Sequence, residues 1–297
     1  MSHQDATVIA TYSRRMRLRF DDGDEVDARI KGKKLKPVCG DRVRAEPIPD
    51  EDDWLITSIH ERRNELARPN IKGQREVLAA NVDLLVVVAA ALPKADWYIV
   101  DRYLCSAELM GVDGAVVYNK TDLQPPDEDA LGVYRRLGYE TLATSAEASE
   151  GIEELSQLLT GKTAIIVGQS GVGKSSLINL LSEESAQRVA EISDKHREGR
   201  HTTVNSVMIP LPCGGNVIDS PGVRDFAPAL STPEEAIIGF REIHEAGENC
   251  RFANCRHLRE PDCAVKNAVD SGDIDPRRYE SYRRAVALTE RLQKDRY

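Results

Sequence analysis

Two short motifs, and the order in which they occur, constrain the fold of this chain more than any other feature. Asn119-Lys120-Thr121-Asp122 comes first, and a glycine-rich stretch from Gly168 to Ser175 follows it. The apolar runs Gly114–Tyr118 and Thr163–Val167 lie directly before the two motifs and predict strands that end at them. Helical patterns follow, so we expect βαβ units and an α/β domain.

The other elements of this domain follow from apolar patterning. Val82–Ala90 is nearly continuous Val, Leu and Ala, as expected of a central parallel strand covered on both faces. Apolar residues at helical spacing predict helices over Ile99–Met110, Ile152–Leu159 and Lys174–Leu181. Beyond the prolines at 228 and 233 the pattern becomes helical, and cysteines and a histidine are embedded in it.

The glycine-rich stretch predicts a phosphate-binding loop. Its sequence is Gly168-Gln169-Ser170-Gly171-Val172-Gly173-Lys174-Ser175, and Ser176 follows in the expected helix. The glycines permit a backbone that aims successive N–H groups at a phosphate chain. Lys174 reaches the β and γ oxygens, and the Ser175 hydroxyl can ligate Mg²⁺. The start of a helix directly after the loop favours negative charge there. We therefore expect all nine residues to bind a nucleoside triphosphate together with Mg²⁺.

The earlier motif selects the base. The carboxylate of Asp122 can accept hydrogen bonds from guanine N1–H and the exocyclic amine, which adenine does not offer in that arrangement. A buried carboxylate without these partners would be unfavourable, so adenine is rejected. Asn119 and Lys120 belong to the same guanine-reading motif. By resemblance to small GTPases, Ser145-Ala146 supplies a backbone N–H to guanine O6. In Ras-like GTPases the phosphate loop comes first, so this order indicates a circularly permuted GTPase domain.

Two further segments resemble the switches of such enzymes. Asp219-Ser220-Pro221-Gly222 follows the apolar strand Asn216–Ile218, where Asp219 can hold Mg²⁺ through water and the Gly222 N–H can sense the γ-phosphate. Upstream, Gly199-Arg200-His201-Thr202-Thr203 offers a threonine that could close over Mg²⁺, and we favour Thr203 over Thr202.

Val223 stands where Ras-like enzymes carry the glutamine that orients the attacking water. Either hydrolysis is very slow or another group supplies this function, and His201 is the nearest polar candidate for a catalytic residue. The alternative is that His201 is an exposed histidine beside a loop, without a catalytic role.

A third set of residues has the spacing Cys250-x4-Cys255-x-His257-x5-Cys263. Three thiolates and one imidazole match a closed, tetrahedral structural Zn²⁺ site, which leaves no open position for chemistry. Six cysteines in 297 residues are too few for a disulfide scaffold, and three of them lie in this short segment. The alternative is that these cysteines are incidental or buried for packing.

The first seventy residues differ from the rest. Five short strands separated by Gly- or Pro-bearing turns predict a small barrel of the OB type. They are expected at Ala6–Tyr12, Met16–Phe20, Val26–Ile30, Asp41–Glu46 and Trp54–His60. From Arg14 to Arg44 there are eleven Lys or Arg and six Asp or Glu. Such a surface could follow a phosphate backbone, or it could be a solvated basic face. Asp275–Tyr297 reads as a helix rich in basic residues and is a second candidate RNA-facing element.

The composition argues against several classes of protein. No apolar run approaches the roughly 20 residues that span a bilayer, and no secretory signal is visible, so we expect a cytoplasmic protein without a membrane partner. The net charge of −9 argues against generic adhesion to nucleic acid, although an average can hide local patches.

Taken together, these motifs resemble one family, the ribosome small-subunit-dependent GTPases of bacteria called RsgA. The resemblance covers the OB-like region, the permuted motifs, the Gly-Arg-His-Thr-Thr segment and the Cys/His cluster. It implies GTP hydrolysis that is stimulated by the small ribosomal subunit during its late assembly, with release after hydrolysis. It also implies one Zn²⁺ at the cluster and a catalytic role for His201. Val204 stands where the usual pattern has a third threonine, which bears on the choice of Mg²⁺ ligand.

The chain is therefore expected to be multi-domain. We expect an OB-fold RNA-binding domain at 1–68, a circularly permuted GTPase domain at 69–228 and a mainly helical zinc-binding domain at 229–297. The expected partners are the small ribosomal subunit, its rRNA and GTP or GDP, and we expect a monomer. Two alternatives stay open: an RNA-binding zinc protein in which nucleotide only stabilises the fold, and a stand-alone metabolic or signalling NTPase.

Overall fold

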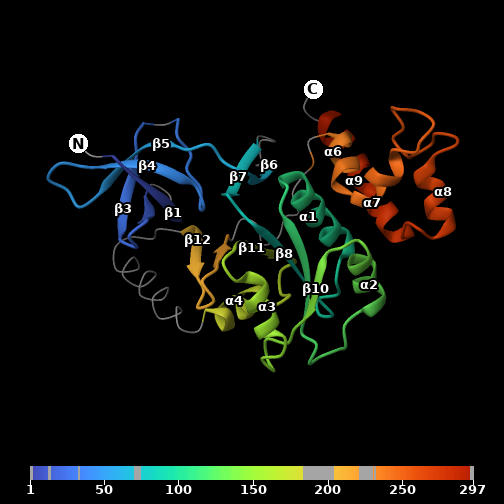
Figure 1. The fold of residues 1–297 in the computed structure, drawn as a ribbon, viewed down its shortest axis with the longest axis horizontal. Coiled ribbons are helices and arrows are strands. Elements are labelled where there is room, and N and C mark those ends of the chain that lie inside the picture. Colours follow the sequence, from blue (N-terminus) through green and yellow to red (C-terminus); the bar gives the residue numbers. More distant parts are fainter. Residues whose placement is uncertain are drawn as a thin grey trace.

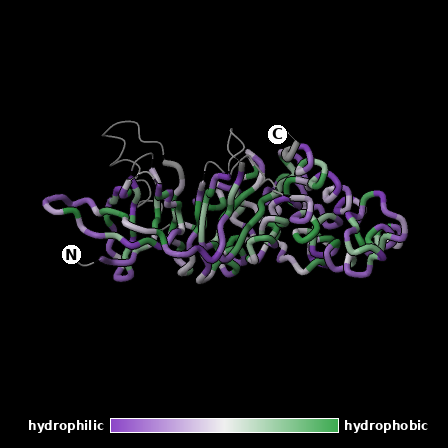
Figure 2. The backbone as a smooth tube through the Cα atoms, turned by 90° about the horizontal axis from the view of Figure 1, so that it is seen from above, coloured by the Kyte–Doolittle hydropathy of each residue, from purple (hydrophilic) through white to green (hydrophobic). Residues whose placement is uncertain are grey.

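The computed structural model describes residues 3–12, 15–32, 34–69, 75–182, 204–220, 230 and 232–294. Figure 1 shows an elongated molecule, with a small group of strands at the N-terminal end, a sheet flanked by helices in the middle and a helical part at the other end. In Figure 2 the hydrophobic segments lie inside each part, while loops that project at the barrel end are hydrophilic. Among the described residues, no helix is long and apolar enough to cross a membrane.

The N-terminal strands form a closed barrel, as the sequence predicted. They are β1 (Gln4–Tyr12), β2 (Met16–Phe20), β3 (Glu25–Ile30), β4 (Arg42–Pro47) and β5 (Trp54–Ile59). The pairing order is β1-β2-β3-β5-β4, and β4 pairs back onto β1. The core of the barrel contains fully buried residues such as Leu18, Val43 and Ile56. Alternation of apolar and polar residues along each strand produces this core.

The central part is a six-stranded section of sheet in the order β10-β9-β8-β11-β13-β12. All neighbouring pairs in it are parallel except β12 and β13. The strands are β8 (Leu84–Ala90), β9 (Asp113–Asn119), β10 (Glu140–Ala143), β11 (Thr163–Gly168), β12 (Val204–Pro210) and β13 (Asn216–Asp219). This arrangement confirms the predicted α/β class.

Helices cover both faces of the central sheet. They are α1 (Trp97–Met110), α2 (Glu128–Arg136), α3 (Ile152–Leu159) and α4 (Lys174–Leu181). Alternate residues of β8 belong to two different cores: Leu85 and Val87 pack with residues of α1 and α2, whereas Leu84 and Val86 pack with residues of α3 and α4. Every residue of β8 is buried, which explains its continuous apolar sequence.

Backbone hydrogen bonding joins the barrel to the central sheet. β1 pairs antiparallel with β12, with Ala10 opposite Val207 and Thr11 opposite Ser206. The result is one sheet of eleven strands that runs through both parts. A hairpin of β6 (Glu65–Pro69) and β7 (Arg75–Ala80) forms a separate two-stranded sheet between them, and β6 spans the expected boundary at residue 68.

The C-terminal part contains α6 (Pro233–Gly239), α7 (Arg241–Gly247), α8 (Ala264–Ser271) and α9 (Pro276–Lys294), in line with its predicted helical character. It packs on α1 of the central part. Gly239 lies so close to α1 that a Cβ there would sit 1.9 Å from Cys105 Sγ.

A buried ionic cluster of Asp101, Glu242 and Arg278 adds to this contact. The Arg278 guanidinium, 1% exposed, donates to Asp101 of α1 (2.9 Å) and to both carboxylate oxygens of Glu242 of α7 (2.7 and 2.8 Å). Side chains of α9, α1 and α7 are thereby held together.

Candidate functional site

The glycine-rich loop lies between the end of β11 and the start of α4, as expected of a phosphate-binding loop. Gly168 has φ +136°, and a Cβ there would lie 2.2 Å from the carbonyl oxygen of Val88, so only glycine lets β11 end this close to β8. The buried Lys174 donates from Nζ to the carbonyls of Gly168 (2.7 Å) and Gln169 (2.6 Å). Its ammonium group therefore lies over the loop, while Ser175 and Ser176 are exposed in the first turn of α4.

Asn119 connects the two predicted motifs. Its side chain is buried, its Nδ2 donates to the carbonyl of Val172 in the loop (2.9 Å), and its Oδ1 accepts from the backbone N–H of Ala146 (3.2 Å) and from Thr144 Oγ1 (3.1 Å). A Cβ on Gly173 would lie 2.3 Å from Asn119 Nδ2. Segments far apart in the chain thus meet at one amide side chain.

Lys120 and Asp122 lie beside Asn119. Lys120 Nζ donates to the carbonyls of Leu92 (2.7 Å) and Gly171 (2.6 Å). Asp122 Oδ1 accepts a 2.6 Å hydrogen bond from the Ser145 hydroxyl, whose oxygen in turn accepts from the N–H of Ala148. Asp122 is exposed at the surface, and the hydroxyl of the fully buried Ser145 fixes the orientation of its carboxylate.

The structure describes only some of the predicted switch residues, namely Asp219 and Ser220. Asp219 ends β13, which pairs with β11, so it lies near the strand that leads into the phosphate loop. Ser220 is buried, and its hydroxyl lies 2.9 Å from that of Ser206 on β12. The predicted residues His201, Thr203 and Gly222, together with Thr202 and Val223, lie outside the described residues.

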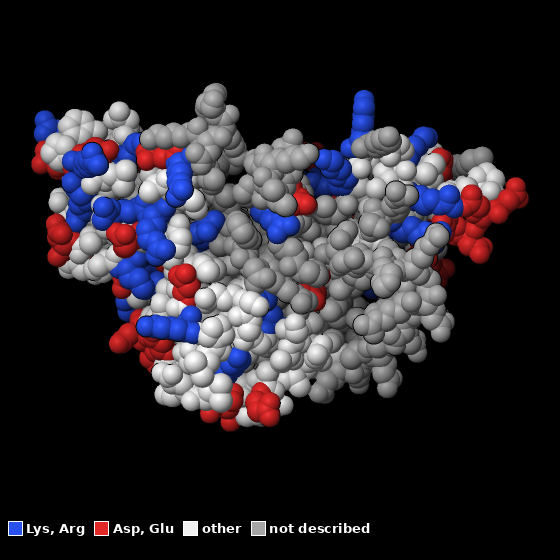
Figure 3. Space-filling model, turned by 180° about the vertical axis from the view of Figure 1, so that it is seen from behind, with Lys and Arg blue, Asp and Glu red and all other residues white. Residues whose placement is uncertain are grey.

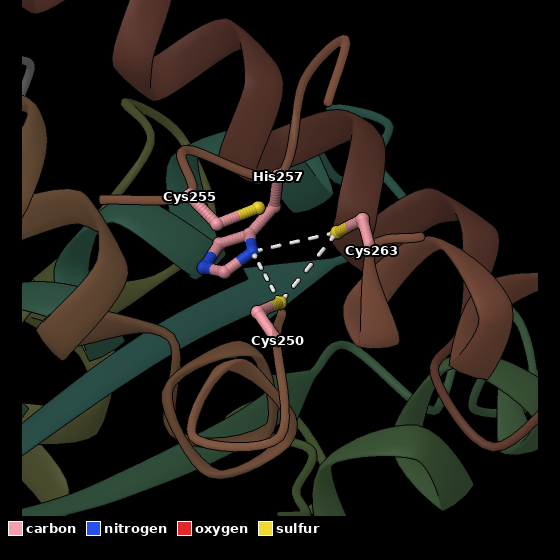
Figure 4. A group of neighbouring side chains, drawn as sticks. All are labelled: Cys250, Cys255, His257 and Cys263. Atoms are coloured by element: carbon pink, nitrogen blue, oxygen red, sulfur yellow. Dashed lines mark hydrogen bonds between the residues drawn. The ribbon is translucent and has the colours of Figure 1, made fainter. Parts of the chain in front are cut away.

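The Cys/His residues form one cluster that could hold a metal ion. The three Sγ atoms and the imidazole nitrogen of Cys250, Cys255, His257 and Cys263 all lie within 4.8 Å of one another. Cys250 Sγ is 3.8 Å from Cys263 Sγ, and His257 Nδ1 is 3.4 Å and 3.5 Å from these sulfurs. Figure 4 shows the four side chains converging from separate stretches of loop and from the start of α8.

Residues that sequence reasoning missed hold the loop of this cluster. Tyr279 and Tyr282 of α9 donate hydroxyl hydrogen bonds to the carbonyls of His257 (2.6 Å) and Arg256 (2.7 Å). The Glu260 carboxylate accepts backbone N–H groups of Arg256, Leu258 and Arg259. Burial raises the pKa of Glu260, but the backbone hydrogen bonds have the larger combined effect and lower the pKa to about 2. A glutamate among other charged residues carries no sequence signal for such a role.

Comparison with known proteins decides the family. The model of the RsgA GTPase family matches residues 59–228. A small ribosomal subunit biogenesis GTPase RsgA of Haemophilus influenzae (strain 86-028NP) is 38% identical over 291 residues, which cover 95% of this chain and 84% of the relative. The protein of the same name from Actinobacillus pleuropneumoniae serotype 5b (strain L20) is 35% identical, covering 99% of this chain and 88% of the relative. The chain belongs to the RsgA GTPase family.

Solved structures agree with this assignment. The crystal structure of YjeQ from Thermotoga maritima has a TM-score of 0.74 and 31% identity, and the match covers 97% of this chain and 99% of that one. YloQ, described as a circularly permuted GTPase, has a TM-score of 0.73 and 27% identity over 100% of this chain and 96% of its own. The family drawn from the motifs is confirmed, and so is the permuted order. The chain is a GTPase, which removes the alternative of a non-enzymatic RNA-binding zinc protein.

Proposed function

We propose that this GTPase acts in the late maturation of the small ribosomal subunit, that the subunit stimulates GTP hydrolysis, and that hydrolysis drives release. The observation that carries the proposal is the match, over nearly the whole chain, to relatives named as small ribosomal subunit biogenesis GTPases. The architecture supports it, because a barrel and a helical part flank the GTPase sheet. A stand-alone metabolic NTPase leaves both flanking parts without a role.

The nucleotide is proposed to bind across the junction that Asn119 makes. Asp122, oriented by Ser145, would read guanine, and Ala146 would lie beside the base. The loop from Gly168 to Ser176 would surround the phosphates, with the ammonium group of Lys174 already over the loop. Asp219 would hold Mg²⁺ through water, and the Gly222 N–H would sense the γ-phosphate. Ser175 and Thr203 would ligate Mg²⁺, which neutralises phosphate charge when bound. His201 is proposed as the catalytic residue in place of the missing glutamine.

The metal at the cluster is proposed to be a single structural Zn²⁺. Tetrahedral coordination with Zn–S bonds of about 2.3 Å gives sulfur–sulfur edges of about 3.8 Å. The Cys250–Cys263 separation of 3.8 Å fits this edge. Three thiolates and one imidazole fill four positions, so the site would stabilise the loop and leave no position for a substrate.

The two flanking parts are proposed to contact rRNA, with domain bounds of 1–68, 69–228 and 229–297. On the barrel, the described arginines between Arg15 and Arg44 all form ion pairs, for example Arg42 with Asp21 at 2.6 Å. The exposed lysines of the β3–β4 loop, Lys31, Lys34 and Lys36, form no ion pair among the described residues. These lysines, more than the arginines, are the side chains available to phosphates.

The experiment is multiple-turnover GTP hydrolysis by the full chain with and without purified small ribosomal subunits. We expect slow turnover alone and a large stimulation by the subunit. Isolated large subunits are the matched control and should not stimulate. Equal rates in all three reactions would contradict the proposal and favour a stand-alone GTPase.

A further inference from the structure

A groove of about 390 Å³ lies between the loop that follows β8 and helix α9. One wall is formed by residues 94–98, which lead into α1. The other wall is formed by residues of the first half of α9. The lining residues are Lys94, Ala95, Asp96, Trp97, Tyr98, Arg277, Glu280, Ser281 and Arg284. The groove therefore lies where the GTPase part and the helical part meet.

The cations of this groove are available, and its carboxylates are engaged. Among the described residues, neither Lys94 nor Arg284 forms an ion pair, and Arg284 Cζ lies 3.9 Å from the centroid of the Tyr98 ring. Asp96 caps α1 by accepting from the N–H of Tyr98 (3.0 Å), and Glu280 pairs with Arg283 outside the groove (3.0 Å). The groove thus offers two cations that have no ion-pair partner among the described residues and that lie beside aromatic rings.

The described arginines of the barrel differ in this respect, because ion pairs occupy them. In Figure 3, Lys and Arg side chains gather over the helical part, whereas acidic side chains gather at the far tip of the barrel. Unpaired lysine and arginine next to aromatic rings are typical of surfaces that contact an RNA backbone.

Hydrogen bonds connect the groove to the nucleotide motifs. The backbone N–H of Asp96, in the groove wall, donates to the side-chain oxygen of Gln169 in the phosphate loop (2.9 Å). Lys120 of the base-reading motif donates to the carbonyl of Leu92, two residues before Lys94, and to Gly171 of the phosphate loop. A ligand that restrains residues 92–96 would also restrain the phosphate loop.

We infer that this groove binds a phosphodiester segment of ribosomal RNA through Lys94 and Arg284, and that its occupation contributes to the stimulation of GTP hydrolysis. The inference rests on the proposed function, because it places one contact of the small subunit. It adds a site at which the subunit touches both the helical part and the segment bonded to the phosphate loop.

The test is the double variant Lys94→Ala/Arg284→Ala in the full-length, metal-loaded protein. Arg291→Ala is the charge control, because Arg291 is exposed on the same helix and does not line the groove. Affinity for purified small subunits is measured with a non-hydrolysable GTP analogue over a range of salt, and hydrolysis is measured alone and at saturating subunit. Metal content and thermal unfolding establish that the variant folds.

We expect the double variant to bind subunits at least about tenfold more weakly and to lose about two units of salt slope, one for each phosphate contact. Its rate without subunits should equal the wild-type rate, while its rate at saturating subunit falls. Wild-type affinity and salt slope in the double variant, or an equal loss in Arg291→Ala, would overturn the site. Weaker binding with a wild-type saturated rate would overturn the connection to hydrolysis. If the wild-type protein neither binds nor responds to subunits, the proposed function fails and this inference fails with it.

A second measurement identifies the partner. Ultraviolet cross-linking of the complex, followed by mass spectrometry, should give nucleotide adducts on the peptide that contains Trp97 and Tyr98. Carbodiimide coupling of Lys94 to a carboxylate of a ribosomal protein, without such adducts, would assign the groove to an acidic protein surface instead.

Discussion

The two parts that flank the GTPase sheet are attached to it in different ways. The barrel is joined through backbone hydrogen bonds between β1 and β12, the strand that begins directly after Thr203. The helical part is joined through side chains, with the buried Arg278–Asp101 pair and close packing of α6 on α1. Backbone pairing depends little on residue identity, whereas a buried ion pair depends on both partners. The first attachment therefore depends mainly on backbone geometry, and the second on particular side chains.

The two flanks should also differ in what stabilises them, and removing the metal ligands has the largest expected effect. Cys250→Ser/Cys263→Ser should lose the metal and unfold the helical part while the barrel and the GTPase core stay folded. Structural zinc contributes on the order of 10 kcal/mol to small zinc domains. Metal analysis and hydrogen exchange check this. Cys213→Ser, a half-buried cysteine outside the cluster, is the control and should keep about one Zn²⁺ per chain. Full metal content in the double variant would remove the site.

The next largest effect concerns the ion pair that docks the helical part. Arg278→Ala leaves the fully buried carboxylate of Asp101 without one of its guanidinium partners, and should lower the free energy of unfolding by about 3–5 kcal/mol. Denaturant unfolding measures this. Arg283→Ala on the same helix removes an exposed pair and should cost less than about 1 kcal/mol. If the two variants lose equal stability, apolar packing alone holds the helical part.

On the barrel side, the prediction concerns catalysis. His201 shortly precedes β12 in the chain, the strand that pairs with the barrel, and it is proposed to act in place of the missing glutamine. His201→Ala should retain GTP and subunit binding and lose about 10²-fold of the stimulated rate, a typical effect of one positioned proton-transfer group. Single-turnover hydrolysis on small subunits checks this, with His244→Ala, an exposed histidine of α7, as the control. Normal stimulated hydrolysis by His201→Ala would mean that another group positions the water.

The smallest expected effect is a pH dependence confined to the helical part. The pKa of Glu260 is about 2 in the folded protein, below its ordinary value of 4.5. Its stabilising contribution is therefore complete above about pH 4.5 and is lost as pH falls toward 2. Glu260→Gln should be less stable than the wild type near pH 6, and the difference should shrink on acidification. Hydrogen exchange of residues 256–259 at several pH values measures it. A difference that does not change with pH would mean that the ionisation of Glu260 does not contribute to this stability.

The sequence predicted those features that depend on local pattern. The barrel strands begin and end within two residues of the predicted positions, because alternation and turn residues mark them. The helix Lys174–Leu181 has the predicted bounds. The strand β10 was missed because only four residues form it and none is fully buried.

Other features depend on distant partners and carry no local signal. The burial of Arg278 depends on Asp101, 177 positions away, and an arginine in a basic helix reads as an exposed residue. The ion pairs of the barrel arginines could not be read from the residue count, because their carboxylate partners lie on neighbouring strands and turns.

The pairing of β1 with β12 also protects the sheet. In an α/β sheet, the outermost strand presents unpaired N–H and C=O groups that can pair with another molecule. Here β12 is hydrogen-bonded on both sides, to β13 and to β1, so the barrel covers what would be an open edge. A GTPase fragment without the barrel would expose that edge, and we expect such a fragment to self-associate through β12.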